Sequence, residues 1–263
     1  MQEEFETTTV EFGEETGVGH LTLNRPDALN ALSAQLRADI VAGLRELNGL
    51  NDDGIVMRAV VLEGEGGNFC AGADINEFEE GPPTTEVNRS HYEFIMDYPV
   101  PVIAKIRGYC LGGGLETAMS CDFRIADTDA RFGLPEVDLG IIPGAGGVQF
   151  ISRLANPSIA KEIAMTGEHV PAERGVELGI FNAVHDPEEL DDAVDEFAAE
   201  LASKPPLAIQ TIKESANIAT QTGLREGLEY DNKVFDPLLA TEDHKEGAKA
   251  FAEDDYEPEF KGR

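Results

Sequence analysis

The amino-acid sequence predicts an α/β fold built from repeated ββα-like units and followed by a helical C-terminal region. Short apolar runs that suit buried strands alternate along the chain with stretches of helical periodicity. Glycine-rich loops join strand to helix in "CLGGGLE" (110–116) and "PGAGGVQ" (143–149). After about Pro205 only helical periodicity remains. Strands and helices that alternate in this way favour an α/β architecture over a β-sandwich.

Hydrophobic periodicity predicts the elements of the first half of the chain. A helix is expected over 34–48, where Leu36, Ile40 and Leu44 repeat at helical spacing. The segment 79–88, "EEGPPTTEVN", is polar and contains prolines, which predicts a mobile loop. The remaining predicted elements here are strands over 17–24, 58–66 and 101–108 and a helix over 89–98.

In the second half of the chain, helices are expected to follow the glycine-rich loops. The first begins at the glycine triplet 112–114, and the second, amphipathic one lies within 142–154. Between them, 122–140 predicts short strands, a kink at Pro135 and a loop. The helical tail after Pro205 fits two arrangements equally well, packing across another subunit or packing on its own core.

Charge is the unusual feature of the composition. The chain of 263 residues carries 20 Lys and Arg against 51 Asp and Glu, a formal net charge of -31. Such a surface repels nucleic acid and anionic lipid, so neither is expected as a partner. Regular apolar periodicity argues against disorder and favours a folded protein with a carboxylate-rich surface, of the kind found in halophiles. No signal-peptide pattern or long apolar run occurs, so a cytoplasmic protein is expected.

The cysteines and histidines do not predict a metal site. Cys70, Cys110 and Cys121 lack the spacing of zinc ligands and are expected to be reduced, buried residues. No two histidines lie four residues apart, as a helical metal pair would require. We therefore expect no bound metal.

The glycine-lined helix starts are the strongest local signals. Gly112, Gly113 and Gly114 would let a ligand oxygen reach the unpaired N–H groups of a helix N-terminus, which is half of an oxyanion hole. The loop "CAGAD" (70–74) could supply the other half, although either loop taken alone fits a simple tight turn as well. Dinucleotide-binding, Walker-type and serine-hydrolase glycine motifs are missing from the sequence.

Two carboxylates stand in unusually apolar surroundings. Glu116 lies among Leu115, Ala118 and Met119, and Glu136 follows Pro135 between apolar runs. Burial raises the pKa of a carboxyl group and suits it to proton transfer. On composition alone, however, a structural role for these buried carboxylates is the more common outcome.

Three segments together resemble the enoyl-CoA hydratase/isomerase (crotonase) family. They are "FCAGADI" (69–75), "PVIAKIRGYCLGGGLETAMSCD" (101–122) and "FGLPEVDLGIIPGAGG" (132–147). The segment "LTLNRPDALNALS" (21–33) is similar to the N-terminal part of the family, and 164–184 and the helical tail are similar to the rest. The resemblance covers nearly the whole chain in the expected order.

The resemblance implies a crotonase-like spiral of ββα units over 1–204, carrying an acyl-CoA site. It also implies a helical region over 205–263 that forms a homotrimer or a dimer of trimers. The thioester oxygen would lie between the N–H groups of Ala73 and Gly113. Glu136 would be the principal proton donor and acceptor, and Glu116 would orient a water. No cofactor is implied, since CoA is part of the substrate. The implied substrate-binding residues are Ala28, Ala71, Asp74, Ile75, Pro135 and Gly144.

The reaction implied is hydration of 2-enoyl-CoA, as in fatty-acid β-oxidation. Two alternatives remain: an enoyl-CoA isomerase, which usually keeps one essential carboxylate, and a non-catalytic acyl-CoA-binding protein. The sequence also departs from the family at positions that often carry basic residues, with Asp27, Asn76 and Phe150. Arg25, Lys105 and Arg107 are the candidate cations for the CoA phosphates.

Overall fold

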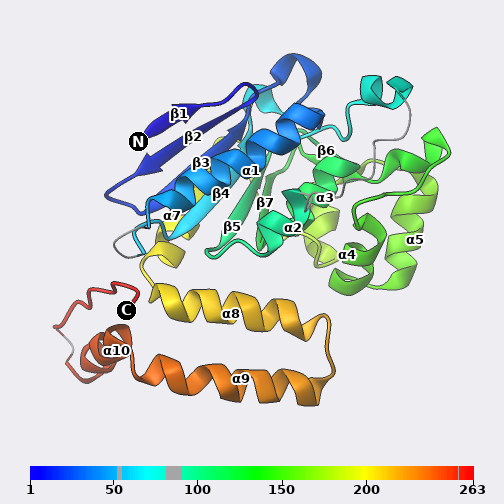
Figure 1. Ribbon diagram of the computed structural model, residues 1–263. Helices are drawn as coiled ribbons and strands as arrows, with labels where there is room; N and C mark the ends of the chain where they lie inside the picture. Colours follow the sequence, from blue (N-terminus) through cyan, green and yellow to red (C-terminus); the bar gives the residue numbers. More distant parts are fainter. Residues whose placement is uncertain (52–54, 81–90, 254) are drawn as a thin grey trace.

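The computed structural model describes residues 1–51, 55–80, 91–253 and 255–263 (Figure 1). Most of the predicted loop 79–88 and the first two residues of the predicted helix 89–98 therefore lie outside the described residues. The other predicted strands and helices of the first half are confirmed, with ends that differ by a few residues.

A seven-stranded sheet forms the centre of the fold, in the order β1-β2-β3-β4-β5-β7-β10. The pairs β1–β2 and β2–β3 are antiparallel, and the pairs from β3–β4 onward are parallel. Its strands are β1 (Gln2–Glu4), β2 (Thr8–Gly13), β3 (Val18–Leu23), β4 (Ala59–Gly64), β5 (Val102–Ile106), β7 (Phe123–Asp127) and β10 (Ala183–His185). The acidic β1 and β2 were not predicted from the sequence.

A second, smaller sheet creates the repeated ββα pattern. It contains β6 (Tyr109–Leu111), β8 (Arg131–Gly133) and β9 (Val170–Pro171). The chain passes from β5 to β6 and then into helix α3 (Gly113–Ser120), and again from β7 to β8 and on to a helical segment. Each unit thus gives one strand to each sheet before its helix, which confirms the predicted ββα units.

Alternating side chains bury both faces of the central sheet. Val60, Leu62 and Val102 face the larger core, which also contains the apolar side of α1 (Ala34–Gly49). Val61 and Ile103 face the opposite way and pack with Val194 and other residues of α7 (Leu190–Ala202). Parallel strands that are covered on both faces have continuous apolar sequences, as in the "AVVL" segment of β4. The cysteines Cys70, Cys110 and Cys121 are free thiols within the core.

The remaining helices flank the sheets and form the C-terminal region. They are α2 (His91–Met96), α4 (Gly147–Leu154), α5 (Pro157–Thr166), α6 (Ala172–Glu177), α8 (Pro206–Ala219), α9 (Leu224–Leu239) and α10 (Glu242–Ala252). Figure 1 shows α8 and α9 side by side, beyond the edge of the central body. Among the described residues no helix is long and apolar enough to cross a bilayer.

Buried polar contacts fasten the C-terminal region to the body. Lys213 of α8 donates to the carboxylate of Asp122 at 2.7 Å and to the carbonyl of Val100 at 3.1 Å. At the other end of the region, Arg58 donates to the carbonyl of Phe260 at 2.6 Å. Apolar side chains of α8 and α9 nevertheless remain exposed, including Ile212, Leu224, Leu228 and Phe235.

One prediction was wrong in detail. The segment after Pro135, expected as a loop, forms the 3₁₀ helix Pro135–Leu139. Proline at the first helical position has its φ angle already set for a helical turn and has no N–H to leave unpaired, so it starts the helix rather than only bending the chain. Gly140, at a φ of +73°, ends it.

We expect the fold to depend on salt because the core is ordinary and the net charge of -31 falls largely on the surface. At 1 M salt the Debye length is about 3 Å, so repulsion between surface carboxylates is screened. The melting temperature should rise by several degrees between low and molar NaCl. Sucrose at matched osmolality is the control, because it does not screen charge. A melting temperature that does not change with NaCl would contradict this prediction.

Candidate active site

The start of helix α3 is built from three glycines, and two of them, Gly112 and Gly114, are required for different reasons. Gly112 has a φ of +50°, a conformation that side chains disfavour, and its N–H donates to the carbonyl of Gly133 at 2.9 Å. A Cβ on Gly112 would also lie 2.8 Å from Oε1 of Glu136. A Cβ on Gly114 would lie 2.2 Å from the carbonyl oxygen of Cys70, which is an impossible contact with backbone. The glycines therefore let the helix start approach two other segments.

The loop 70–74 is the first of these segments, and strand-like hydrogen bonds hold it beside α3. The N–H of Leu111 donates to the carbonyl of Cys70 at 3.0 Å, and the N–H of Leu32 donates to the carbonyl of Gly72 at 2.8 Å. A Cβ on Gly113 would lie 3.6 Å from the nitrogen of Ala73. Neither the Ala73 N–H nor the Gly113 N–H donates to the backbone carbonyl of another described residue. Two unpaired N–H groups therefore lie close together at a helix N-terminus, where the helix dipole favours negative charge.

Glu116 lies in the first turn of α3 and is 3% exposed. Its Oε1 accepts hydrogen bonds from the N–H groups of Ala145 and Gly147, both at 2.8 Å. Burial raises the pKa of this carboxyl group, while the two N–H donors act in the opposite direction. The loop before α4 and the first residue of α4 thus fix the orientation of the Glu116 carboxylate.

Glu136 approaches the same place from the 3₁₀ helix that Pro135 begins. Its carboxylate lies against Gly112, whose carbonyl accepts the N–H of Glu116 at 2.9 Å. Burial raises the pKa of Glu136, and the negative charge of Glu116 raises it further. Its Oε2 is buried and has no hydrogen-bond partner among the described residues. Two carboxylates that are distant in sequence therefore come together at the start of α3, and one of them keeps an unsatisfied oxygen.

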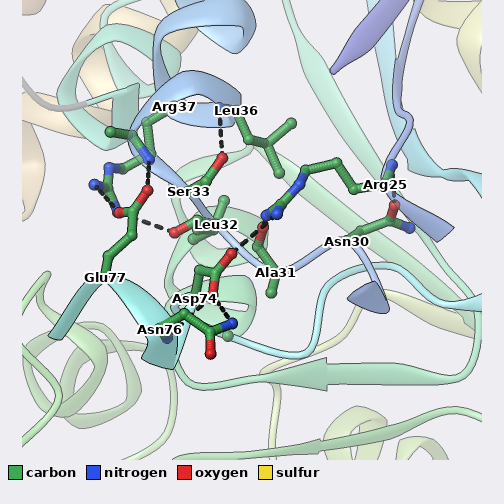
Figure 2. Close-up of polar contacts among 12 residues, drawn as sticks. Arg25, Asn30, Ala31, Leu32, Ser33, Leu36, Arg37, Asp74, Asn76 and Glu77 are labelled. Atoms are coloured by element: carbon green, nitrogen blue, oxygen red, sulfur yellow. Dashed lines mark hydrogen bonds and ion pairs between the residues drawn. The ribbon is translucent and has the colours of Figure 1, made fainter. Parts of the chain in front are cut away.

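Ion pairs hold the 74–77 segment against the chain that precedes α1 and against the first turn of α1 (Figure 2). Arg25 donates to Oδ2 of Asp74 at 2.9 Å, and Arg37 pairs with Glu77 at 3.2 Å. Arg37 also donates to the carbonyl of Leu32 at 3.1 Å. These contacts hold the chain that directly follows Ala73, and hydrogen bonds of Leu32 with Gly72 and Asp74 hold the residues on either side of it.

The candidate phosphate-binding cations are all engaged within the protein. Arg25 is paired with Asp74. Lys105 is 8% exposed, lies on the α7 side of the sheet and pairs with Asp191 at 2.9 Å. Arg107 pairs with the same Asp191 at 3.0 Å. These cations therefore join elements of the fold to one another.

The expected substrate-binding residues lie around the two carboxylates and the two N–H groups. Ala71 donates its N–H to the carbonyl of Leu29, the residue after Ala28, at 3.0 Å. Asp74 and Ile75 continue the loop 70–74, and the Ile75 side chain is 61% exposed. Pro135 precedes Glu136, and Gly144 precedes the Ala145 N–H that holds Glu116. Their roles toward a ligand remain predictions.

Sequence reasoning missed two contributions to this site. The N–H groups that hold Glu116 belong to Ala145 and Gly147, and a backbone donor leaves no signal in residue identity. The Tyr92 hydroxyl, on α2, lies 3.2 Å from where a Cβ on Gly113 would be. The sequence predicted a helix here but not which of its side chains would reach α3.

Comparison with known proteins yields consistent matches. A model of the enoyl-CoA hydratase/isomerase family matches residues 13–263. The short-chain-enoyl-CoA hydratase of Clostridium acetobutylicum is 36% identical, over 98% of this chain and 100% of that protein. The crotonyl-CoA hydratase of Syntrophomonas wolfei is 37% identical, over 89% and 90%. A solved structure of an enoyl-CoA hydratase subunit from Geobacillus kaustophilus has a TM-score of 0.90 and 38% identity, over 99% and 100% of the two chains.

We expect Gly112→Ala to lower the free energy of unfolding by about 1–3 kcal/mol, because it places a side chain at positive φ against Glu136. Gly49→Ala is the matched control. Nothing lies within 4 Å of a Cβ at this last residue of α1, so the replacement should stabilise the protein by about 0.5–1 kcal/mol. Urea unfolding followed by circular dichroism measures both. Equal effects of the two replacements would contradict the geometry described for Gly112.

Glu136→Gln is expected to raise the melting temperature at about pH 7 and to have little effect near pH 4. A carboxyl whose pKa is raised by folding stabilises the protein below its ordinary pKa, and that contribution is lost as pH rises through the raised value. The amide removes the penalty of ionising this half-buried group. Asp138→Asn, at an exposed residue of the same 3₁₀ helix, is the control and should show no such pH dependence. A lower melting temperature for Glu136→Gln at pH 7 would refute the stated cause.

Proposed function

Because this chain belongs to the enoyl-CoA hydratase/isomerase family, we propose that it hydrates 2-enoyl-CoA thioesters reversibly to 3-hydroxyacyl-CoA. The observation that carries this proposal is the meeting of Glu116 and Glu136 at one helix start, beside two unpaired N–H groups. An acyl-CoA ester is the substrate class that the family implies. Hydration needs polarisation of the thioester, a held water and a path for a proton, and each need has candidate groups here.

The N–H groups of Ala73 and Gly113 polarise the thioester in this proposal. The thioester oxygen accepts hydrogen bonds from both, and the dipole of α3 stabilises the enolate-like charge that forms when the β-carbon is attacked. Loss of one such donor typically costs roughly 3 kcal/mol of transition-state stabilisation. Fixed backbone donors also need no reorganisation as the charge develops.

The two glutamates handle the water. Glu116, already oriented by the Ala145 and Gly147 N–H groups, holds the water through its other carboxylate oxygen. Glu136, whose Oε2 is unsatisfied, holds it from the other side. The water oxygen bonds to the β-carbon, and Glu136 passes a proton to the α-carbon and is reprotonated from the water. One molecule of water is added across the double bond, and dehydration is the reverse.

Two alternatives within this family predict different outcomes. An isomerase moves a proton between two carbons and needs one carboxylate, so the second, tethered glutamate favours hydration. A non-catalytic acyl-CoA-binding protein would gain nothing from a buried and a half-buried carboxylate whose pKa values are both raised. Incubation with a 2-enoyl and with a 3-enoyl thioester separates all three: a hydratase consumes the first, an isomerase converts the second into the first, and a binder changes neither.

We also propose that residues 205–263 provide contacts between subunits in a homotrimer or a dimer of trimers, while residues 1–204 carry the acyl-CoA site. The exposed apolar side chains of α8 and α9, such as Ile212, Leu224 and Phe235, support this division. Burying them against another copy would remove apolar surface from water, the usual driving force of stable assemblies.

Glu136→Gln and Glu116→Gln are each expected to lower the kcat for crotonyl-CoA hydration by about 10²-fold or more, since each removes a group that binds the water or moves the proton. Loss of absorbance at the conjugated thioester measures the rate. Asp138→Asn is the control and should retain full activity, because this exposed carboxylate lies two residues beyond Glu136. Near-unchanged turnover of Glu136→Gln would remove the assigned role.

A further inference from the structure

Tyr92 is a polar group beside the paired N–H groups that the proposed mechanism has not used. If Gly113 had a Cβ atom, that atom would lie 3.2 Å from the Tyr92 hydroxyl oxygen and 3.6 Å from the Ala73 nitrogen. The hydroxyl and the Ala73 nitrogen therefore both lie close to Gly113, and the lack of a side chain there allows this close approach. Leu32 is also near, with its Cδ1 3.0 Å from the same point.

A buried hydrogen-bonded chain fixes the part of α2 that carries Tyr92. His91 is 2% exposed, and its Nε2 lies 3.0 Å from the Thr117 hydroxyl, which itself donates to the carbonyl of Gly113 at 2.8 Å. The Thr117 proton is thus committed to Gly113, so the His91 Nε2 is the donor in its contact with Thr117. Burial lowers the pKa of His91 to about 3, which keeps the ring neutral. The rings of His91 and Tyr92 have centroids 3.8 Å apart.

The Tyr92 hydroxyl is a neutral hydrogen-bond donor at any working pH. Burial raises its pKa above the ordinary value for tyrosine, and the charge of Glu116 raises it further. Tyr98, also near α2, differs, because its hydroxyl donates to the carbonyl of Leu44 at 2.7 Å and ties α2 to α1. Among the described residues the Tyr92 hydroxyl donates to no backbone carbonyl. Its side-chain partner is the Thr117 hydroxyl, which it would exchange for a ligand oxygen at the start of α3.

We propose that the Tyr92 hydroxyl is a third hydrogen-bond donor to the thioester oxygen, alongside the N–H groups of Ala73 and Gly113. This inference rests on the proposed acyl-CoA site. A phenol is more acidic than a peptide N–H, so its hydrogen bond strengthens as negative charge builds on the oxygen. The hydrogen bond then stabilises the transition state more than the bound substrate, so its loss should lower kcat and leave KM nearly unchanged.

Tyr92→Phe tests the proposal, because it removes one oxygen and keeps the ring that packs on His91. We expect kcat for crotonyl-CoA hydration to fall about 10- to 100-fold, with KM changed less than about twofold. Tyr98→Phe is the matched control. It should lower the melting temperature, since it leaves the Leu44 carbonyl without its donor, while kcat stays at the wild-type value.

A spectroscopic measurement gives a second readout that does not depend on turnover. A thioester conjugated to an electron-rich aromatic ring absorbs at longer wavelength when hydrogen bonds polarise its carbonyl. We expect the bound chromophore to show a smaller red shift in Tyr92→Phe than in the wild type, and an unchanged shift in Tyr98→Phe. A structural role for Tyr92 would not produce this difference.

The outcomes separate the two proposals. If the wild type hydrates crotonyl-CoA while Tyr92→Phe keeps its kcat and its red shift, the third donor is refuted and the proposed function stands. A rise in KM alone also refutes the donor role, because it shows that Tyr92 only borders the acyl group. If the wild type binds the chromophore but hydrates nothing, the proposed function fails, and the red shift still decides the role of Tyr92.

Discussion

The close approach of helix α3 to the 70–74 loop is the contact on which the site depends. The Gly114 Cα lies so near the Cys70 carbonyl that no side chain could be added. Backbone hydrogen bonding of the β-bridge type between Cys70 and Cys110, whose thiols are free, continues the contact into the smaller sheet. This proximity brings the N–H groups of Ala73 and Gly113 together. A helix start even slightly farther away would separate the two donors, and they could then not both donate to the same ligand oxygen.

The same helix start organises the two carboxylates in different ways. Glu116 is tethered, because the N–H groups of Ala145 and Gly147 hold one oxygen. Glu136 is confined but incompletely bonded, with Oε2 buried and unsatisfied among the described residues. Buried polar atoms normally find partners, so an unpaired one carries an energetic cost that a purely structural residue would not explain. The difference between the two glutamates fits one that orients a water and one that exchanges a proton.

Much of this arrangement was predictable, because residue identity reveals it. Three adjacent glycines before a helix indicate close backbone approach, and Glu116 and Glu136 are unusual carboxylates in apolar sequence. The donors to Glu116 were not predictable, since any residue has an N–H and only the fold brings Ala145 and Gly147 to it. Tyr92 was missed for a related reason: the sequence predicts α2, but packing through His91 and Thr117 decides which side chain faces Gly113.

The use of positive charge inside the protein explains how so acidic a chain forms an ordered site. Arg25 joins Asp74 to the segment before α1, Lys105 and Arg107 join β5 and its following loop to α7, and Lys213 joins α8 to Asp122. Each of these cations links elements that are distant in sequence and shields at least one carboxylate. These pairs leave most of the unbalanced negative charge on the surface, where salt can screen it. If the chain binds a CoA ester as proposed, this anionic ligand approaches against a repulsion that depends on ionic strength. The hydrogen bonds that backbone donors would give its thioester oxygen do not depend on ionic strength in this way.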